Sequence, residues 1–164
     1  MSKSFTLIEL IIILLLVGIL AIVTVPRMLS IQGFRQEATL NKVKADLKYV
    51  MEFAVNNSCK TRVAYNTTGD TSYTATTDLS GSWDDMTDPT THTSPFTVTL
   101  NTGNYLGVKI TNVNFDGHAG VEFDSIGRPY SYGGGSATLL SSDGSITLTG
   151  GKSITITVDT GRIY

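Results

Sequence analysis

The beginning of the chain contains an unbroken apolar run, Phe5 to Val25, in which Glu9 is the only charged residue. A helix over this run would be roughly 31 Å long at about 1.5 Å per residue, which matches the hydrocarbon thickness of a bilayer. The run therefore predicts a helix that can span a membrane. Because the apolar residues follow Met1–Ser4 directly, the layout of a secretory signal with its cleavage site behind the apolar core does not fit. We expect any cleavage to remove the tetrapeptide in front of the run.

The residues around this start form a recognisable pattern: a basic Lys3, a small Ser4, and then the string Phe-Thr-Leu-Ile-Glu-Leu at residues 5–10. This pattern resembles the class III leader and first helix of type IV pilins and type II secretion pseudopilins. The resemblance implies that a prepilin peptidase cuts between Ser4 and Phe5 and methylates the new amino terminus at Phe5. Ser4 stands where the family usually has glycine.

Glu9 has two interpretations. An ionised acid at the centre of a bilayer costs about 3 kcal/mol, but a position near the helix end can reach headgroups and water, so Glu9 could lie at a membrane surface. In pilin-like filaments the resemblance implies that Glu9 pairs with the amino terminus of a neighbouring subunit, at Phe5. Because an unpaired buried charge is strongly penalised, such a pair would fix the axial register of assembly. The surrounding string favours pairing.

Two residues of the apolar segment indicate places where the helix could bend or unwind. Gly18 adds backbone freedom, and Pro26 removes a backbone donor and clashes with the preceding turn. The alternative for Pro26 is that it merely ends the membrane segment. The filament resemblance implies local loss of helical order between the two residues.

Behind Pro26 the pattern becomes amphipathic. Apolar residues recur at spacings of three or four, at Leu40, Val43, Leu47, Val50 or Met51, and Ala54. We expect this half of the helix to pack on a β-sheet and to end near residues 56–58. The predicted fold is α+β: a long N-terminal helix, with a hydrophobic front half and an amphipathic rear half, packed on a small antiparallel β-sheet head, as in pilins. The predicted segments are leader 1–4, transmembrane or filament-core helix 5–26, amphipathic half 27–57, variable loop region 58–95 and sheet head 96–164.

Alternation of apolar and polar residues after Pro95 predicts strands at residues 96–100, 106–110, 146–148 and 154–158. Turns are expected at 101–104, 116–117, 143–144 and 150–151, and the head should hold five to seven short strands. In the loop region before them, Trp83 is interpreted as pinning the loop, with contact to a partner as the alternative. Residues 121–129, with the later strings 154–158 and 160–163, resemble the minor pilin and pseudopilin group typified by GspH and FimT.

Catalysis finds little support in the sequence, and we predict that the chain is not an enzyme. His92 and His118 stand in polar surroundings, and nucleotide-binding and nucleophile motifs are absent. The single cysteine, Cys59, cannot form an internal disulfide. We expect no cofactor. Asp84, Asp85 and Asp88 are candidates for binding calcium, because Ca²⁺ prefers oxygen ligands. They are weak candidates, because acidic surface loops are ordinarily just solvated.

Binding of nucleic acid is not favoured. Residues 31–164 carry 10 Lys or Arg and 13 Asp or Glu, a balance of −3, whereas a phosphate-binding head normally shows a basic patch. Arg162 is the only counterpart of the carboxyl-terminal basic residues through which some FimT-like minor pilins take up DNA. We interpret it as a solvated surface residue, with a local DNA contact as the alternative.

The predicted function is a structural filament subunit of a type IV pilus or of a type II secretion pseudopilus. Its partners would be further copies of itself or related pilins, the prepilin peptidase and an inner-membrane assembly platform. Two alternatives are a DNA-binding minor pilin and a single-span anchor of a β domain that never polymerises. Basic residues behind the apolar run outnumber Lys3 in front of it, so the positive-inside rule alone places the head in the cytoplasm. The resemblance implies the opposite, a bacterial inner-membrane protein with its head outside the cytoplasm, later in a periplasmic pseudopilus or a cell-surface pilus, and we follow it.

Overall fold

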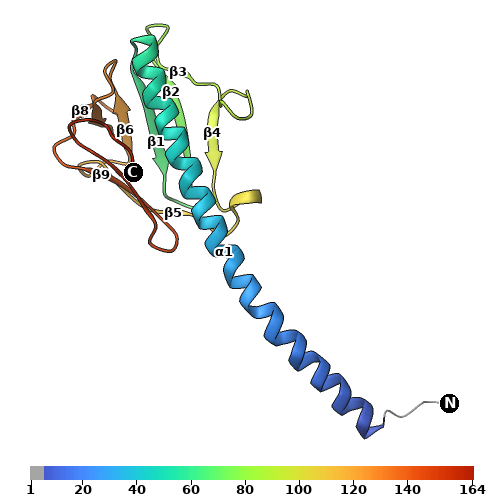
Figure 1. The fold of residues 1–164 in the computed structure, drawn as a ribbon. Helices are drawn as coiled ribbons and strands as arrows, with labels where there is room; N and C mark the ends of the chain where they lie inside the picture. The colour runs from blue at the N-terminus through green and yellow to red at the C-terminus, as the bar shows by residue number, and fades with distance from the viewer. Residues whose placement is uncertain (1–5) are drawn as a thin grey trace. The chain divides into compact units, whose positions relative to one another are not determined.

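The structure is a computed structural model that describes residues 6–164, without the side chains of residues 23–30 (Figure 1). The chain divides into two compact units, Met1–Phe34 and Arg35–Tyr164, and helix α1 (Leu7–Asn57) contributes to both. The helix is therefore described as two stretches, Leu7–Ile22 and Ile31–Asn57.

This division corrects the expected architecture. We predicted one long helix packed on the head, but the helical residues form two stretches, Leu7–Ile22 and Ile31–Asn57, and the boundary between the two units falls after Phe34. The physical reason is the change in side-chain pattern, since the first stretch is apolar on all sides whereas the second has one apolar face that a sheet can cover. The α+β class agrees with the structure.

The second stretch of α1 packs as its periodicity predicts. Leu40, Val43, Leu47, Val50 and Ala54 are all buried, whereas Met51 is only half-buried. The helix ends at Asn57, where Ser58 adopts a positive φ of 51°. The N–H of Ser58 donates to the carbonyl of Val55, and the N–H of Cys59 donates to that of Ala54. These two bonds are the Schellman arrangement, which satisfies carbonyls left open at a helix end.

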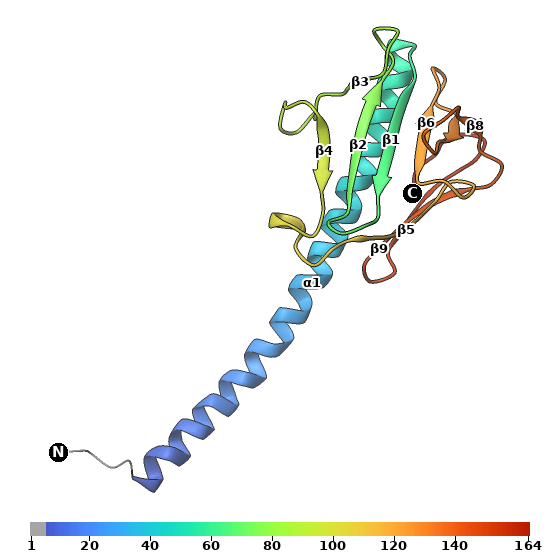
Figure 2. The ribbon, with the colours of Figure 1, turned by 180° about the vertical axis from the view of Figure 1, so that it is seen from behind.

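The head contains ten strands in two antiparallel sheets, not the single small sheet that we expected. The larger sheet has the order β3-β2-β1-β6-β7-β8, with β4 also paired to β2, and Figure 2 shows β4, β2 and β1 side by side. Its strands are β1 (Thr61–Asn66), β2 (Ser72–Thr77), β3 (Asp84–Asp85), β4 (Phe96–Thr99), β6 (Gly120–Phe123), β7 (Pro129–Ser131) and β8 (Thr138–Leu139).

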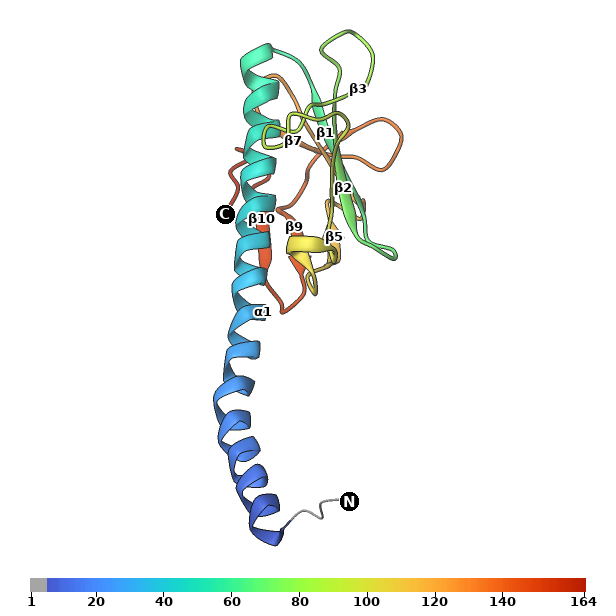
Figure 3. The ribbon, with the colours of Figure 1, turned by 90° about the vertical axis from the view of Figure 1, so that its right-hand side faces the viewer.

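The smaller sheet has the order β10-β9-β5, formed by β5 (Ile110–Asn114), β9 (Gly144–Leu148) and β10 (Ser153–Ile156). Its β9–β10 turn lies beside the helix (Figure 3), where Lys152 Nζ is 2.9 Å from Glu37 Oε2. The inward-facing residues of both sheets and of the helix form one core, in which Phe96, Phe115 and Phe123 are the largest fully buried side chains.

The segment 58–95 is the clearest error of the sequence-based prediction. We expected a long variable loop with at most one short strand, but β1, β2 and β3 lie there, and β1 is a central strand paired with both β2 and β6. This segment is rich in threonine, serine and tyrosine and has few large aliphatic residues, so its alternation of apolar and polar residues predicts strands only weakly. Tyr65, Tyr73 and Ala75 nevertheless face the core.

Smaller corrections concern the carboxyl-terminal strands. Residues 103–105 form a short 3-10 helix, and β5 begins only at Ile110, so the strand predicted at 106–110 is wrong. Gly144 lies in β9 rather than in a turn; a Cβ there would come within 2.3 Å of the Phe115 ring, so glycine permits close packing. Positive φ angles confirm the other three predicted turns, at Asn101 and Gly103, at Asp116 and Gly117, and at Gly150 and Gly151.

Candidate functional site

The first candidate site is the apolar stretch of α1 from Leu7 to Ile22. Its large apolar side chains are exposed, from 44% at Ile13 to 76% at Leu7 and Ile22. Gly18 lies within this stretch, and a Cβ at that position would meet nothing within 4 Å. In the part of the chain that is described, no helix meets the length and apolarity needed to cross a bilayer.

Glu9 closes a capping box at the start of this stretch. The Thr6 hydroxyl and backbone N–H both donate to Glu9 Oε2 at 3.1 Å, and the Glu9 N–H donates back to Thr6 Oγ1 at 3.4 Å. A threonine followed three residues later by glutamate satisfies two open N–H groups reciprocally at a helix N-terminus. The carboxylate also lies at the positive end of the helix dipole. The sequence contains this signal, but our interpretation of Glu9 as a register residue did not use it.

Three other predicted residues of the N-terminal segment lie wholly or partly outside the described part of the chain. Ser4 and Phe5, the predicted cleavage and methylation site, lie outside the described residues, and so does the side chain of Pro26. The predicted roles of these residues stay predictions.

The weak calcium candidates do not converge. Asp84 accepts hydrogen bonds from the hydroxyls of Ser80 and Ser82, and Asp85 is exposed in β3. Asp88 caps its own turn by accepting the N–H groups of Thr90 and Thr91. Among residues whose positions are described, no group of three or more His, Cys, Asp or Glu side chains is arranged to hold a metal ion.

The carboxyl-terminal candidate Arg162 is exposed at a tight turn, and its guanidinium lies 5.8 Å from the centroid of the Tyr164 ring. Its backbone N–H donates to Thr157 Oγ1 at 2.9 Å. Neither contact forms a phosphate site. Cys59 is buried as a free thiol, with its sulfur 3.4 Å from Thr77 Oγ1.

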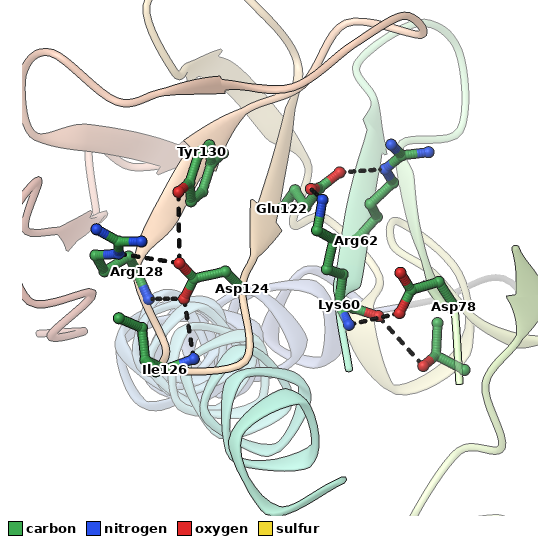
Figure 4. Close-up of polar contacts among 9 residues, drawn as sticks. Lys60, Arg62, Asp78, Glu122, Asp124, Ile126, Arg128 and Tyr130 are labelled. Carbon is green, nitrogen blue, oxygen red and sulfur yellow. Dashed lines mark hydrogen bonds and ion pairs between the residues drawn. The ribbon is translucent and has the colours of Figure 1, made fainter. Parts of the chain in front are cut away.

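An ionic and aromatic cluster that the sequence did not reveal lies on the face of the larger sheet opposite its core, where Arg62 of β1 is the register partner of Glu122 of β6. Arg62 Nε donates to Glu122 Oε2 at 2.6 Å, and Lys60 Nζ is 3.6 Å from Glu122 Oε1 (Figure 4). The guanidinium of Arg62 lies between two rings, 3.5 Å from the centroid of Trp83 and 4.2 Å from that of Tyr132. We call these five residues the Arg62 cluster. The Trp83 ring, 38% exposed, contacts the Arg62 side chain of β1 from the loop that precedes β3. The prediction that burial of Trp83 pins this loop is therefore wrong in its burial.

A second missed group is the turn after β6. Asp124 Oδ1 accepts the N–H groups of Ile126 and Arg128, and its Oδ2 accepts Arg128 Nε at 2.9 Å (Figure 4). Partial burial opposes ionisation of Asp124, but these backbone and guanidinium donors outweigh it and lower its pKa. The arrangement holds the turn closed and leaves Ile126 exposed.

Asp46 is a buried acid between α1 and the larger sheet. Lys42 Nζ donates to its Oδ1 at 2.6 Å, and the Tyr73 hydroxyl of β2 donates to its Oδ2 at 2.5 Å. Burial raises the pKa of Asp46 above its ordinary value, against the lowering effect of these two donors. The Lys42–Asp46 spacing of four residues was visible in the sequence, but the partner on β2 was not.

Comparison of the chain with protein-family models, with curated proteins and with solved structures finds no match. The functional argument therefore depends on the residues themselves, on the exposed apolar stretch above all.

Proposed function

We propose that this chain is a pilin-like structural subunit that is processed and methylated at its amino terminus and assembles into a type IV pilus or a type II secretion pseudopilus. The observation that carries the proposal is the exposed apolar stretch Leu7–Ile22 with Glu9 as its only ionisable residue. The string at residues 5–10 resembles the amino terminus of such subunits.

The energetics of the stretch support a role in association. Burying one exposed Leu or Ile side chain contributes about 1.5–3 kcal/mol, so these side chains require either lipid or protein around them. Lipid covers apolar side chains as well as protein does, but it does not pair a carboxylate, whose burial costs about 2.5–3.5 kcal/mol at the bilayer centre and less toward a helix end. A bundle of identical helices offers both an apolar surface and, at each Phe5, a positive amino terminus. Glu9 thereby favours the bundle over lipid.

The proposal includes the location and partners of the chain. The subunit is held in the bacterial inner membrane by residues 5–26, with its head outside the cytoplasm, until the assembly platform adds it to the filament. The prepilin peptidase acts first, because the amine that pairs with Glu9 exists only after cleavage between Ser4 and Phe5.

The test is substitution of Glu9 in the producing organism. We expect Glu9→Leu to enter the membrane normally and to fall about 100-fold in the sheared filament fraction, since the loss of a buried ion pair costs 3 kcal/mol or more. Glu52→Leu, at an exposed position of α1 in the head, is the matched control and should assemble like the wild type.

Two outcomes would contradict the proposal. Equal incorporation of Glu9→Leu and wild type would show that Glu9 does not select the register of assembly, and absence of both from the filament fraction would indicate an anchor that never polymerises. Mass spectrometry that finds an intact Met1 in the native material, without a methylated Phe5 species, would exclude processing.

A further inference from the structure

The ammonium group of Lys42 lies between two carboxylates on different parts of the head. Its Nζ donates to Asp46 Oδ1 at 2.6 Å, and its second contact is the Thr90 hydroxyl at 3.4 Å. Thr90 belongs to the segment between β3 and β4, and its backbone N–H donates to Asp88 Oδ1 at 2.7 Å. A continuous set of hydrogen bonds thus joins the helix carboxylate to the carboxylate of this segment, residues 86–95.

The surroundings of the two acids differ. Burial raises the pKa of Asp46, and repulsion by Asp88 adds to this effect. At Asp88, partial burial opposes ionisation, but the N–H groups of Thr90 and Thr91 and the attraction of Lys42 outweigh it, so its pKa is lowered. On acidification Asp46 therefore takes up its proton first, while Asp88 is still charged.

The other groups that face Asp46 keep their charge state. Tyr73 on β2 and Tyr65 on β1 have pKa values raised well above their ordinary range by burial and by the Asp46 charge, so both stay neutral. Tyr105 also raises the pKa of Tyr73, by electrostatic repulsion. The Tyr73 hydroxyl can donate to a neutral Asp46 as well as to a charged one, because Oδ2 remains an acceptor. The contact between helix and sheet thus persists while the charge attraction between Asp46 and Lys42 is lost.

We propose that Lys42 is a proton-controlled clamp: when Asp46 is charged, Lys42 is held on the helix, and when Asp46 is protonated, Lys42 turns to Asp88 and draws segment 86–95 onto α1. Lys42 already stands 5.7 Å from the Phe96 ring, at the start of β4, so the movement is a rotation of a long side chain within one contact region. The device makes this face of the head sensitive to acidity, independently of the proposed function.

The experiment is an NMR titration of the full chain in detergent micelles, which follows the carboxyl carbons of Asp46 and Asp88, the Lys42 side-chain nitrogen and the Thr90 amide. We expect the Lys42 and Thr90 signals to shift together at the midpoint of Asp46. In Asp46→Asn, the Thr90 amide at neutral pH should already have the position that the wild type reaches in acid.

Controls separate the clamp from other causes. His92→Gln removes the imidazole of the segment and should leave the response intact, whereas Lys42→Met should abolish the Thr90 shift and keep the Asp46 titration. If Asp46→Asn fails to fold, Lys42→Met decides alone. A Thr90 amide that does not follow Asp46, or that follows it equally in Lys42→Met, overturns the proposal, and so does loss of the response in His92→Gln.

Discussion

The Arg62 cluster predicts that Arg62 contributes far more to stability than a surface arginine. The Glu122 side chain is 3% exposed and that of Arg62 is 17% exposed, so their bond at 2.6 Å is largely shielded from water. Removing one partner of a buried ion pair costs about 3–5 kcal/mol, because the other charge is left uncompensated. Lys60, 3.6 Å from Glu122 but 54% exposed, recovers part of this loss.

These terms give an expected magnitude for Arg62→Ala. Because Lys60 remains near Glu122, the broken pair should cost somewhat less than this range, about 2–3 kcal/mol. Loss of the two ring contacts adds about 0.5–1 kcal/mol, since the guanidinium is partly desolvated between Trp83 and Tyr132. We therefore expect Arg62→Ala to lower the free energy of unfolding by about 3 kcal/mol. Arg62→Lys keeps the charge and loses the planar stack, and should cost about 1–2 kcal/mol.

The assay is urea unfolding of the full chain in detergent micelles, followed by far-ultraviolet circular dichroism, with exposed Lys109→Ala as the control. Replacing both Arg62 and Glu122 by leucine removes both charges and should be less harmful than Arg62→Ala alone. The reasoning is refuted if Arg62→Ala costs under about 1 kcal/mol, the value of an exposed pair, or if the double variant loses as much as the single substitutions combined.

Three further predictions concern other parts of the chain. Gly144→Ala should lower the free energy of unfolding by about 1–3 kcal/mol in the same assay, because its methyl group would strike the buried Phe115 ring; Gly135→Ala, in open space, should not, and equal effects would contradict the packing argument. Thr6→Val should weaken the start of α1 by about 1 kcal/mol through loss of the capping box, seen as faster amide exchange over residues 7–10, whereas Thr6→Ser should retain protection. Asp124 has a lowered pKa in the folded state, so its contribution to stability is present above its ordinary pKa and is lost as pH falls through the lowered value. Asp124→Asn should therefore flatten the fall in the free energy of unfolding at acid pH. An unchanged acid slope would show that the turn does not depend on the charge of Asp124.

Several elements of the head could be predicted from the sequence because their signal is local. The apolar face of the second helix stretch, the end of α1 at Asn57 and the strands at Phe96, Ile146 and Ile154 follow from side-chain spacing and turn residues. The capping box at Thr6 and Glu9 is equally local, and only its interpretation was missing. Such features depend on residues within one or two turns of each other.

The errors occurred where partners are distant in the sequence. β1 and β2 carry a weak apolar alternation, and what makes them strands is burial of Tyr65 and Tyr73 under α1 together with pairing to β6. Likewise, 60 residues separate Arg62 from Glu122, and 27 separate Asp46 from Tyr73. No spacing rule connects such residues before the sheet order is known.

The sequence by itself determined three features: an apolar helix with one acid, an amphipathic helix after it, and a β-rich head. It could do so because hydrophobic periodicity depends on consecutive residues. Only the tertiary structure decided that the head has two sheets, that segment 58–95 supplies the middle of the larger one, and which charges are buried together. The physical reason is that burial and ion pairing depend on which strands become neighbours, and neighbours are chosen by the packing of the whole head.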